Sequence, residues 1–258
     1  MELVSVRLAE AAPRTGRVRL VGEVVYDGRQ REREEYFFEV PAKYAGSLSD
    51  SGNPWLAWLL PLAVTRREPL RLCLPVDPIL FTNASRLMRI WKGWYPRLRI
   101  VPIEAEVKAV EPRPAPTETA AFFSGGVDSF FTVLRNKEMS DRAAFPAIDR
   151  LLCVRGFDID LDNTREFERL RSRLSEAAQD LGLELVDVAM NVREVRFMQA
   201  DWARLSHGSA LASIGLALEK RFRAIYIATS YTGGPPSHPW GSHPSTDLLS
   251  STSRTRII

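Results

Sequence analysis

The sequence predicts an α/β protein in two parts: a smaller, strand-rich α+β domain over residues 1–112 and a doubly wound parallel sheet over residues 119–258. Hairpin-like strand patterns dominate the first part, whereas strands and helices alternate in the second. A run with three prolines at alternate positions, residues 111–118, separates the two. Proline at this spacing excludes a helix or a central strand and favours an extended connector, so residues 113–118 are assigned as the linker.

In the first part, residues 17–26 and 35–40 have the composition of two strands, with a turn signal at Asp27-Gly28 between them. They predict a hairpin. Three further elements follow: a strand over 70–74, a helix over 83–94 capped by Asn83 or Ser85, and a strand region over 98–110. Together they indicate a small β-sandwich or barrel-like module.

The second part predicts strands over 120–123, 150–154, 184–190 and 224–228, and helices over 128–137, 163–181 and 208–220. Strand–helix–strand units make parallel strands, and ligands bind where the carboxyl ends of those strands meet. The last residues, 253–258, have the pattern of a strand that is beginning. This pattern leaves open that the sheet is truncated, with the sequence being either a fragment or a shortened form of the fold.

The composition is that of an ordinary soluble chain, with 45% apolar and 26% charged residues and a net charge of +3. This small charge gives little support for nucleic-acid binding. The N-terminus has no signal-peptide pattern, and the most apolar stretch, Trp55–Val64, is too short to span a bilayer. We therefore expect a cytoplasmic protein with no membrane partner. Cys73 and Cys153 are expected to be buried and reduced, and without a CxxC pair no zinc site is visible.

One string carries most of the chemical information: Ser124-Gly125-Gly126-Val127-Asp128-Ser129, between an apolar strand and a helix. Glycines let a phosphate approach the backbone amides, and a helix start adds N–H donors and a positive dipole end. Ser124 and Ser129 add hydroxyl donors, and Asp128 is suited to hold Mg²⁺ against the phosphates. The alternative is a plain strand–helix turn in which Ser124 or Asp128 is a cap. The string is neither GxxxxGK[ST] nor GxGxxG.

This string resembles the SGGxDS signature of the PP-loop ATP pyrophosphatase superfamily, whose members include asparagine synthetase and 7-cyano-7-deazaguanine synthase. The resemblance covers residues 119–258 and is sharp only over the six-residue loop. It implies a HUP-like (adenine nucleotide alpha-hydrolase-like) fold that binds ATP with Mg²⁺. It also implies that Ser124, Asp128 and Ser129 take part in catalysis, and that Ser124 to Ser129 hold the pyrophosphate.

The same resemblance implies further contacts at the carboxyl ends of two strands. Asp158 and Asp160 follow the second strand and are candidates to contact the nucleotide or an incoming amine. A solvated acidic loop is the alternative. Thr229 and Ser230 follow the fourth strand and are candidates for the α-phosphate, against an ordinary polar turn.

Histidines supply the remaining candidates, because an imidazole binds phosphate and transfers protons near neutral pH. His207 precedes a small-residue helix, and His238 and His243 lie in a proline-containing segment that leads to Asp247. We expect these four residues to contact substrate rather than metal. A structural role at the helix start remains the alternative for His207.

These features predict an ATP-dependent, AMP-forming enzyme that adenylates a small-molecule carboxylate or carbonyl oxygen for transfer to a nitrogen or sulfur nucleophile. Its partners would be ATP, an acceptor and an amine or ammonia donor. Two alternatives stay open. One is a nucleotide-binding module without catalysis that recruits a protein, and the other is a tRNA-modifying enzyme whose residues 1–112 bind the RNA.

Overall fold

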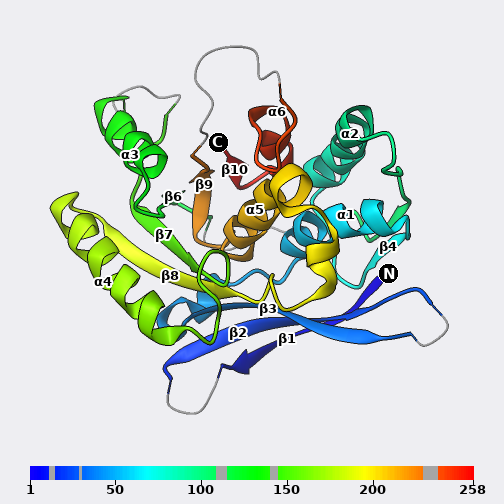
Figure 1. The fold of residues 1–258 in the computed structure, drawn as a ribbon, viewed down its shortest axis with the longest axis horizontal. Coiled ribbons are helices and arrows are strands. Elements are labelled where there is room, and N and C mark those ends of the chain that lie inside the picture. The colour runs from blue at the N-terminus through cyan, green and yellow to red at the C-terminus, as the bar shows by residue number, and fades with distance from the viewer. Residues whose placement is uncertain (12–14, 29–30, 109–114, 140–144, 229–237) are drawn as a thin grey trace.

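The computed structural model describes all residues of the chain except 12–14, 29–30, 109–114, 140–144 and 229–237 (Figure 1). The strands are β1 Glu2–Glu10, β2 Arg17–Val25, β3 Arg33–Pro41, β4 Leu70–Leu72, β5 Ile103–Glu104, β6 Glu118–Phe122, β7 Arg150–Arg155, β8 Glu184–Met190, β9 Phe222–Tyr226 and β10 Arg256–Ile257. The helices are α1 Asn53–Arg66, α2 Pro78–Trp94, α3 Val127–Met139, α4 Thr164–Asp180, α5 His207–Ala217 and α6 Pro244–Asp247, with short 3-10 or π turns between some of them.

The ten strands in the described parts of the chain belong to one sheet, in the order β10-β9-β6-β7-β8-β3-β2-β1-β4-β5. The strands β10, β9, β6, β7 and β8 are parallel to one another, which confirms the α/β class for this part. β6 lies in its middle, between β9 and β7. A central parallel strand opens its carboxyl end onto the edge where ligands bind.

The predicted hairpin is confirmed, because β2 and β3 pair antiparallel from Arg17↔Pro41 to Val25↔Arg33. The first part of the chain does not, however, form a separate sandwich or barrel within the described residues. β3 pairs antiparallel with β8 through Phe38↔Met190, so the hairpin extends the parallel sheet. The side-chain amide of Asn191 strengthens this joint, since it accepts from the Phe37 amide at 2.9 Å and donates to the Glu35 carbonyl at 2.8 Å.

Helices cover both faces of the parallel part (Figure 1). On one face, Ala121 and Phe123 pack with Phe167 and Leu174 of α4. The alternate residues of β6 and β7, together with α5 and α1, belong to the larger core on the other face. This alternation follows from the two-residue period of a strand and produces the layered arrangement that the strand–helix pattern predicts.

α1 was not expected as a helix, although it contains the most apolar stretch of the sequence. It is buried almost all round, and the rings of Trp55 and Trp58 stack at 6.0 Å within the core. None of the helices in the described parts of the chain is long and apolar enough to cross a membrane.

Three further expectations for the first part are corrected. α2 begins at Pro78, not near Asn83, because the Asp77 carboxylate accepts from the amides of Ile79 and Leu80 and caps the helix there. The strand region expected over 98–110 contains only β5 and an isolated bridge at Val107 within its described residues. Cys73 is exposed, because it lies just past the end of the short β4, whereas Cys153 is buried as expected.

Candidate nucleotide site

A pocket of about 290 Å³ opens at the carboxyl ends of β6, β7 and β9. Its polar lining comes from residues that the sequence singled out: Ser124, Gly126, Asp128, Ser129, Asp158 and His207. The size approaches the lower end of the range found for small-molecule sites, and the position is the one that open parallel sheets use. The structure therefore brings six candidate residues from three separate segments to one pocket.

The diglycine loop is folded by local geometry. Gly125 has a φ of +77°, in the left-handed region that glycine adopts without strain. A Cβ at Gly125 would also lie 2.8 Å from Cδ2 of Leu174, so the α4 side chain packs directly against this loop. The amide of Gly126 donates to Oγ of Ser124 at 3.3 Å. The loop is thus a tight, exposed bend that ends where α3 begins.

The hydroxyl of Ser129 holds this bend in place. Ser129 is buried, and its Oγ donates to the carbonyl oxygen of Gly126 at 2.7 Å, while its amide donates to the same oxygen at 3.1 Å. Asp128 lines the pocket, whereas Val127 is 81% exposed and is not part of the lining. The first turn of α3 directs its amides and positive dipole end to this position, where they favour an anion.

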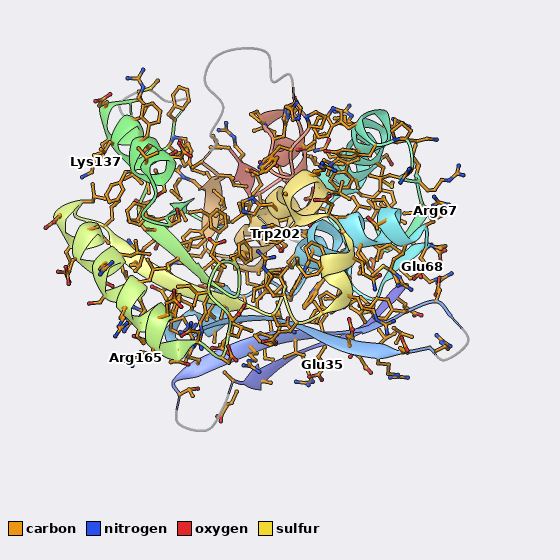
Figure 2. The ribbon with its side chains drawn as sticks, in the orientation of Figure 1. Glu35, Arg67, Glu68, Lys137, Arg165 and Trp202 are labelled. Carbon is orange, nitrogen blue, oxygen red and sulfur yellow. The ribbon has the colours of Figure 1, made fainter. Side chains whose placement is uncertain are left out.

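His207, the first residue of α5, lies in an aromatic group beside the pocket. Its ring centroid is 4.9 Å from that of Trp202 and 6.1 Å from that of Phe157. Trp202 is labelled near the centre of Figure 2. Burial lowers the pKa of His207, with Asp158 opposing the shift and Arg193 adding to it. The imidazole is therefore neutral at pH 7 and can accept a hydrogen bond or a proton.

Arg193 packs against this aromatic group from outside the pocket lining. Its Nε donates to the carbonyl oxygen of Phe157 at 3.0 Å, and its guanidinium lies 4.6 Å from the Trp202 ring centroid. Among the described residues that line the pocket there is no lysine or arginine. The charged side chains of the lining are those of Asp128 and Asp158, and both are acidic. A polyphosphate in this pocket therefore needs a cation beside it.

Other candidates are placed outside this pocket. Asp160 lines a second, smaller pocket of about 190 Å³ with Asp162, Asn191 and Arg193. His238 is exposed in a bend and does not line either pocket. Thr229 and Ser230 lie outside the described residues.

His243 and Asp247 occupy a separate, buried position near the start of α5. His243 caps α6 and packs its ring against Trp94, with centroids 4.9 Å apart. The Asp247 carboxylate accepts from Oγ of Ser242 at 2.7 Å and lies close to Gly208, one residue past His207. Burial raises the pKa of Asp247 to about 6.

The apolar walls of the pocket were missed by sequence reasoning. They comprise Phe122, Phe123, Leu152, Cys153, Val154, Phe157, Ile159, Leu170, Leu211, Ile227 and Ala228. In the sequence such residues have the pattern of strand and helix core, and Leu170 was assigned to the core stripe of its helix. Burial raises the pKa of the Cys153 thiol to about 12, so this cysteine contributes an apolar surface rather than a thiolate.

Comparisons with known proteins give no further assignment: no family model matches the chain, and no curated protein matches it. Within the described residues, no group of three or more His, Cys, Asp or Glu side chains could hold a metal ion.

Proposed function

We propose that the protein is an ATP-dependent, AMP-forming enzyme of the PP-loop ATP pyrophosphatase type, with the HUP-like fold that this implies. The observation that carries the proposal is the diglycine bend between β6 and α3, which shares one pocket with Asp128, Asp158 and His207. A phosphate-gripping loop, an apolar wall and ionisable groups at the carboxyl ends of parallel strands are the parts that such an enzyme needs.

The residues present fit ATP and a magnesium ion. The apolar walls suit a nucleobase, and the loop amides with the α3 N-terminus suit the terminal phosphates. Asp128, placed among acidic and neutral neighbours, is the residue that would hold Mg²⁺. The ion would supply positive charge to the phosphates, which the described lining side chains do not.

In the proposed reaction, a carboxylate or carbonyl oxygen of the acceptor forms a bond to the α-phosphorus of ATP. The bond from that phosphorus to the oxygen bridging the β-phosphate breaks, and pyrophosphate leaves with the electron pair. A nitrogen or sulfur nucleophile then displaces AMP from the activated acceptor. The loop would hold the pyrophosphate, and the neutral His207 would face the bound acceptor.

The products of ATP test this proposal. The protein is incubated with Mg²⁺, ATP labelled at the α-phosphate, ammonia and a panel of small carboxylic acids. AMP with pyrophosphate is the expected pair of products, whereas ADP with orthophosphate contradicts the proposal.

Two substitutions sharpen the test. Asp128→Asn and Ser124→Ala should each lower kcat by roughly 100-fold or more while the circular dichroism spectrum stays unchanged. Asp180→Asn changes an exposed carboxylate at the end of α4 and serves as the matched control, for which full activity is expected. Unchanged turnover in the first two variants would remove those residues from the site.

A further inference from the structure

The exposed side of α2 and the turn after it carry a concentration of positive charge. Residues 78–103 contain five basic residues and no aspartate or glutamate, so this segment alone exceeds the net charge of +3 of the whole chain. All five are exposed, and they are here called the basic face: Arg86, Arg89, Lys92, Arg97 and Arg99. The small net charge of the chain therefore conceals a cluster.

The helical period brings three members of the basic face together. Arg86, Arg89 and Lys92 follow one another at intervals of three residues, so their side chains leave α2 from neighbouring positions on its exposed side. The other side of α2 is packed into the core by its buried residues, Leu80, Ala84, Leu87, Met88 and Trp91. Only the charged side of this helix is available to a partner.

The chain after α2 keeps the remaining members close. The amide of Leu98 donates to the carbonyl oxygen of Tyr95 at 2.9 Å, which forms a turn that holds Arg97 beside the end of α2. Arg67, at the end of α1, borders the basic face, because its guanidinium donates to the carbonyl oxygen of Arg97 at 3.3 Å. Arg67 is labelled at the outer edge of the molecule in Figure 2.

The basic face lacks the carboxylates that usually accompany surface arginines. Within the described residues, none of its five side chains forms an ion pair. α4 provides the contrast, because glutamates lie among its arginines and Arg171 pairs with Glu168 at 2.7 Å. Like charges at helical spacing destabilise a helix, so the uncompensated charge of α2 indicates a partner that supplies negative charge.

The exposed side of α2 favours phosphates over the other anionic surfaces. From residue 82 to residue 93 its exposed residues are Thr82, Arg86, Arg89, Lys92 and Gly93, and none has a large apolar side chain. A protein interface needs an apolar centre, and a membrane-bound helix needs an apolar face. A phosphate backbone needs neither, because guanidinium groups bind phosphate oxygens in pairs and charge alone supplies affinity.

Two polar side chains beside the arginines favour RNA over DNA. Asn83 lies three residues before Arg86, and Ser85 lies four residues before Arg89. Both are partly exposed, and neither side chain makes a hydrogen bond to another described residue. An amide and a hydroxyl can each donate and accept, which matches the ribose 2′-hydroxyl that distinguishes RNA from DNA.

We infer that the basic face binds RNA, with its arginines on phosphates and with Asn83 and Ser85 on ribose hydroxyls. This surface belongs to residues 1–112, where the sequence left RNA binding open. The inference goes beyond the proposed nucleotide chemistry and does not depend on it, because binding is measured without ATP.

Fluorescence anisotropy with a labelled RNA stem-loop, at salt concentrations from about 50 to 200 mM, tests the inference. Arg86→Gln/Arg89→Gln should weaken binding about tenfold or more and reduce the slope of log Kd against log salt by about one for each arginine. Arg169→Gln/Arg173→Gln removes the same charge from exposed positions of α4 and is the matched control, for which affinity within about twofold of the wild type is expected. A wild-type protein that does not bind the RNA at low salt, or equal weakening in both variants, overturns the inference.

A second variant guards against a helix that is disturbed by substitution. Arg97→Gln/Arg99→Gln lies outside α2 and should weaken RNA binding in the same direction, with an unchanged melting temperature. Unchanged RNA affinity in this variant would contradict the inference that these arginines contact the phosphates.

The class of partner is tested with two further probes. A DNA stem-loop of the same sequence should bind more weakly than the RNA, and Asn83→Ala/Ser85→Ala should reduce this difference. Vesicles that contain an anionic phospholipid should not bind. DNA bound as tightly as RNA, or vesicles bound in preference to RNA, would contradict the assignment of this face to RNA.

Discussion

Nδ1 of His243 accepts a hydrogen bond from the amide of Ser245 at 3.0 Å, and this contact makes the histidine the cap of α6. The sequence suggested a substrate-contacting histidine here. The structure places the ring between the helix start and Trp94 instead, among buried side chains. Its removal should therefore be seen in folding rather than in ligand binding.

We predict that His243→Ala lowers the free energy of unfolding by about 1 kcal/mol or more, since the cap and the ring packing are lost together. His243→Asn keeps a capping side chain and should lose less. Urea unfolding measures both values. The dissociation constant for ATP should stay the same, and a clear weakening of ATP binding would return His243 to the site.

Gly156 provides a test of backbone geometry beside the pocket. Its φ is +96°, and an added Cβ would lie 2.0 Å from the carbonyl oxygen of Met190. Gly156→Ala should therefore destabilise the fold by at least about 2 kcal/mol. Gly93→Ala is the matched control, because Gly93 is inside α2 and has nothing within 4 Å of its added Cβ.

The helical control should change stability in the opposite direction. Gly93→Ala is expected to raise the free energy of unfolding by about 0.5–1 kcal/mol, since alanine is the better helix former. Thermal unfolding of both variants gives the comparison. A Gly156→Ala variant as stable as the wild type would show that this turn differs from the one described.

The buried carboxyl of Asp247 should make the free energy of unfolding depend on pH. Its folded pKa is raised to about 6 by burial, from an ordinary value of 3.8. Between these two values the unfolded state has lost the proton that the folded state still binds, so stability falls as pH rises from about 4 to 6. Asp247→Asn has no carboxyl to titrate at this position and therefore removes this loss of stability.

The size of this effect is bounded by the shift, at about 1.4 kcal/mol for each pKa unit and so on the order of 3 kcal/mol at most. The stability of Asp247→Asn relative to the wild type should therefore increase between pH 4 and pH 7, as measured by urea unfolding at each pH. A difference that is constant across this range would mean that Asp247 titrates normally.

Glu219 is almost fully buried and joins the two parts of the chain. One carboxylate oxygen accepts from the hydroxyls of Ser49 and Ser51, each at 2.5 Å, and the other accepts from Nδ2 of Asn53 at 2.8 Å. Burial raises the pKa of this carboxyl. Glu219→Ala leaves the three donors without their acceptor.

We expect Glu219→Ala to cost about 3 kcal/mol or more, because each unsatisfied buried donor loses its hydration as well as its partner. Glu219→Gln keeps one acceptor oxygen and should cost less than half as much. Denaturant unfolding compares the two. Equal losses in both variants would contradict this account, because glutamine keeps both the side-chain volume and one acceptor oxygen and alanine keeps neither.

The predictable part of the fold was the part with local signals. The helix expected over 163–181 is α4, Thr164–Asp180, and the strand expected over 184–190 is β8, and both follow from patterns among neighbouring residues. The joint between β3 and β8 pairs Phe38 with Met190, and no local pattern indicates so distant a partner. α1 was missed because it is apolar on all sides, which removes the periodicity that reveals a helix.

The candidate site likewise contains residues with a local signal in the sequence and residues without one. The bend from Ser124 to Ser129 was found because its glycines and helix start form a recognisable string. Asp158 and His207, which the sequence singled out after a strand and before a helix, both line the pocket. Leu211 was missed because a pocket wall and a packed core have the same composition in a sequence.

The central claim is that the bend between β6 and α3 grips the phosphates of a nucleotide. A crystal structure of the protein with Mg²⁺ and a non-hydrolysable ATP analogue tests it most directly. We predict phosphate oxygens within hydrogen-bond distance, about 3 Å, of backbone amides between Gly125 and Ser129, with the base against the apolar wall. A nucleotide bound elsewhere, with the bend empty, would contradict the account.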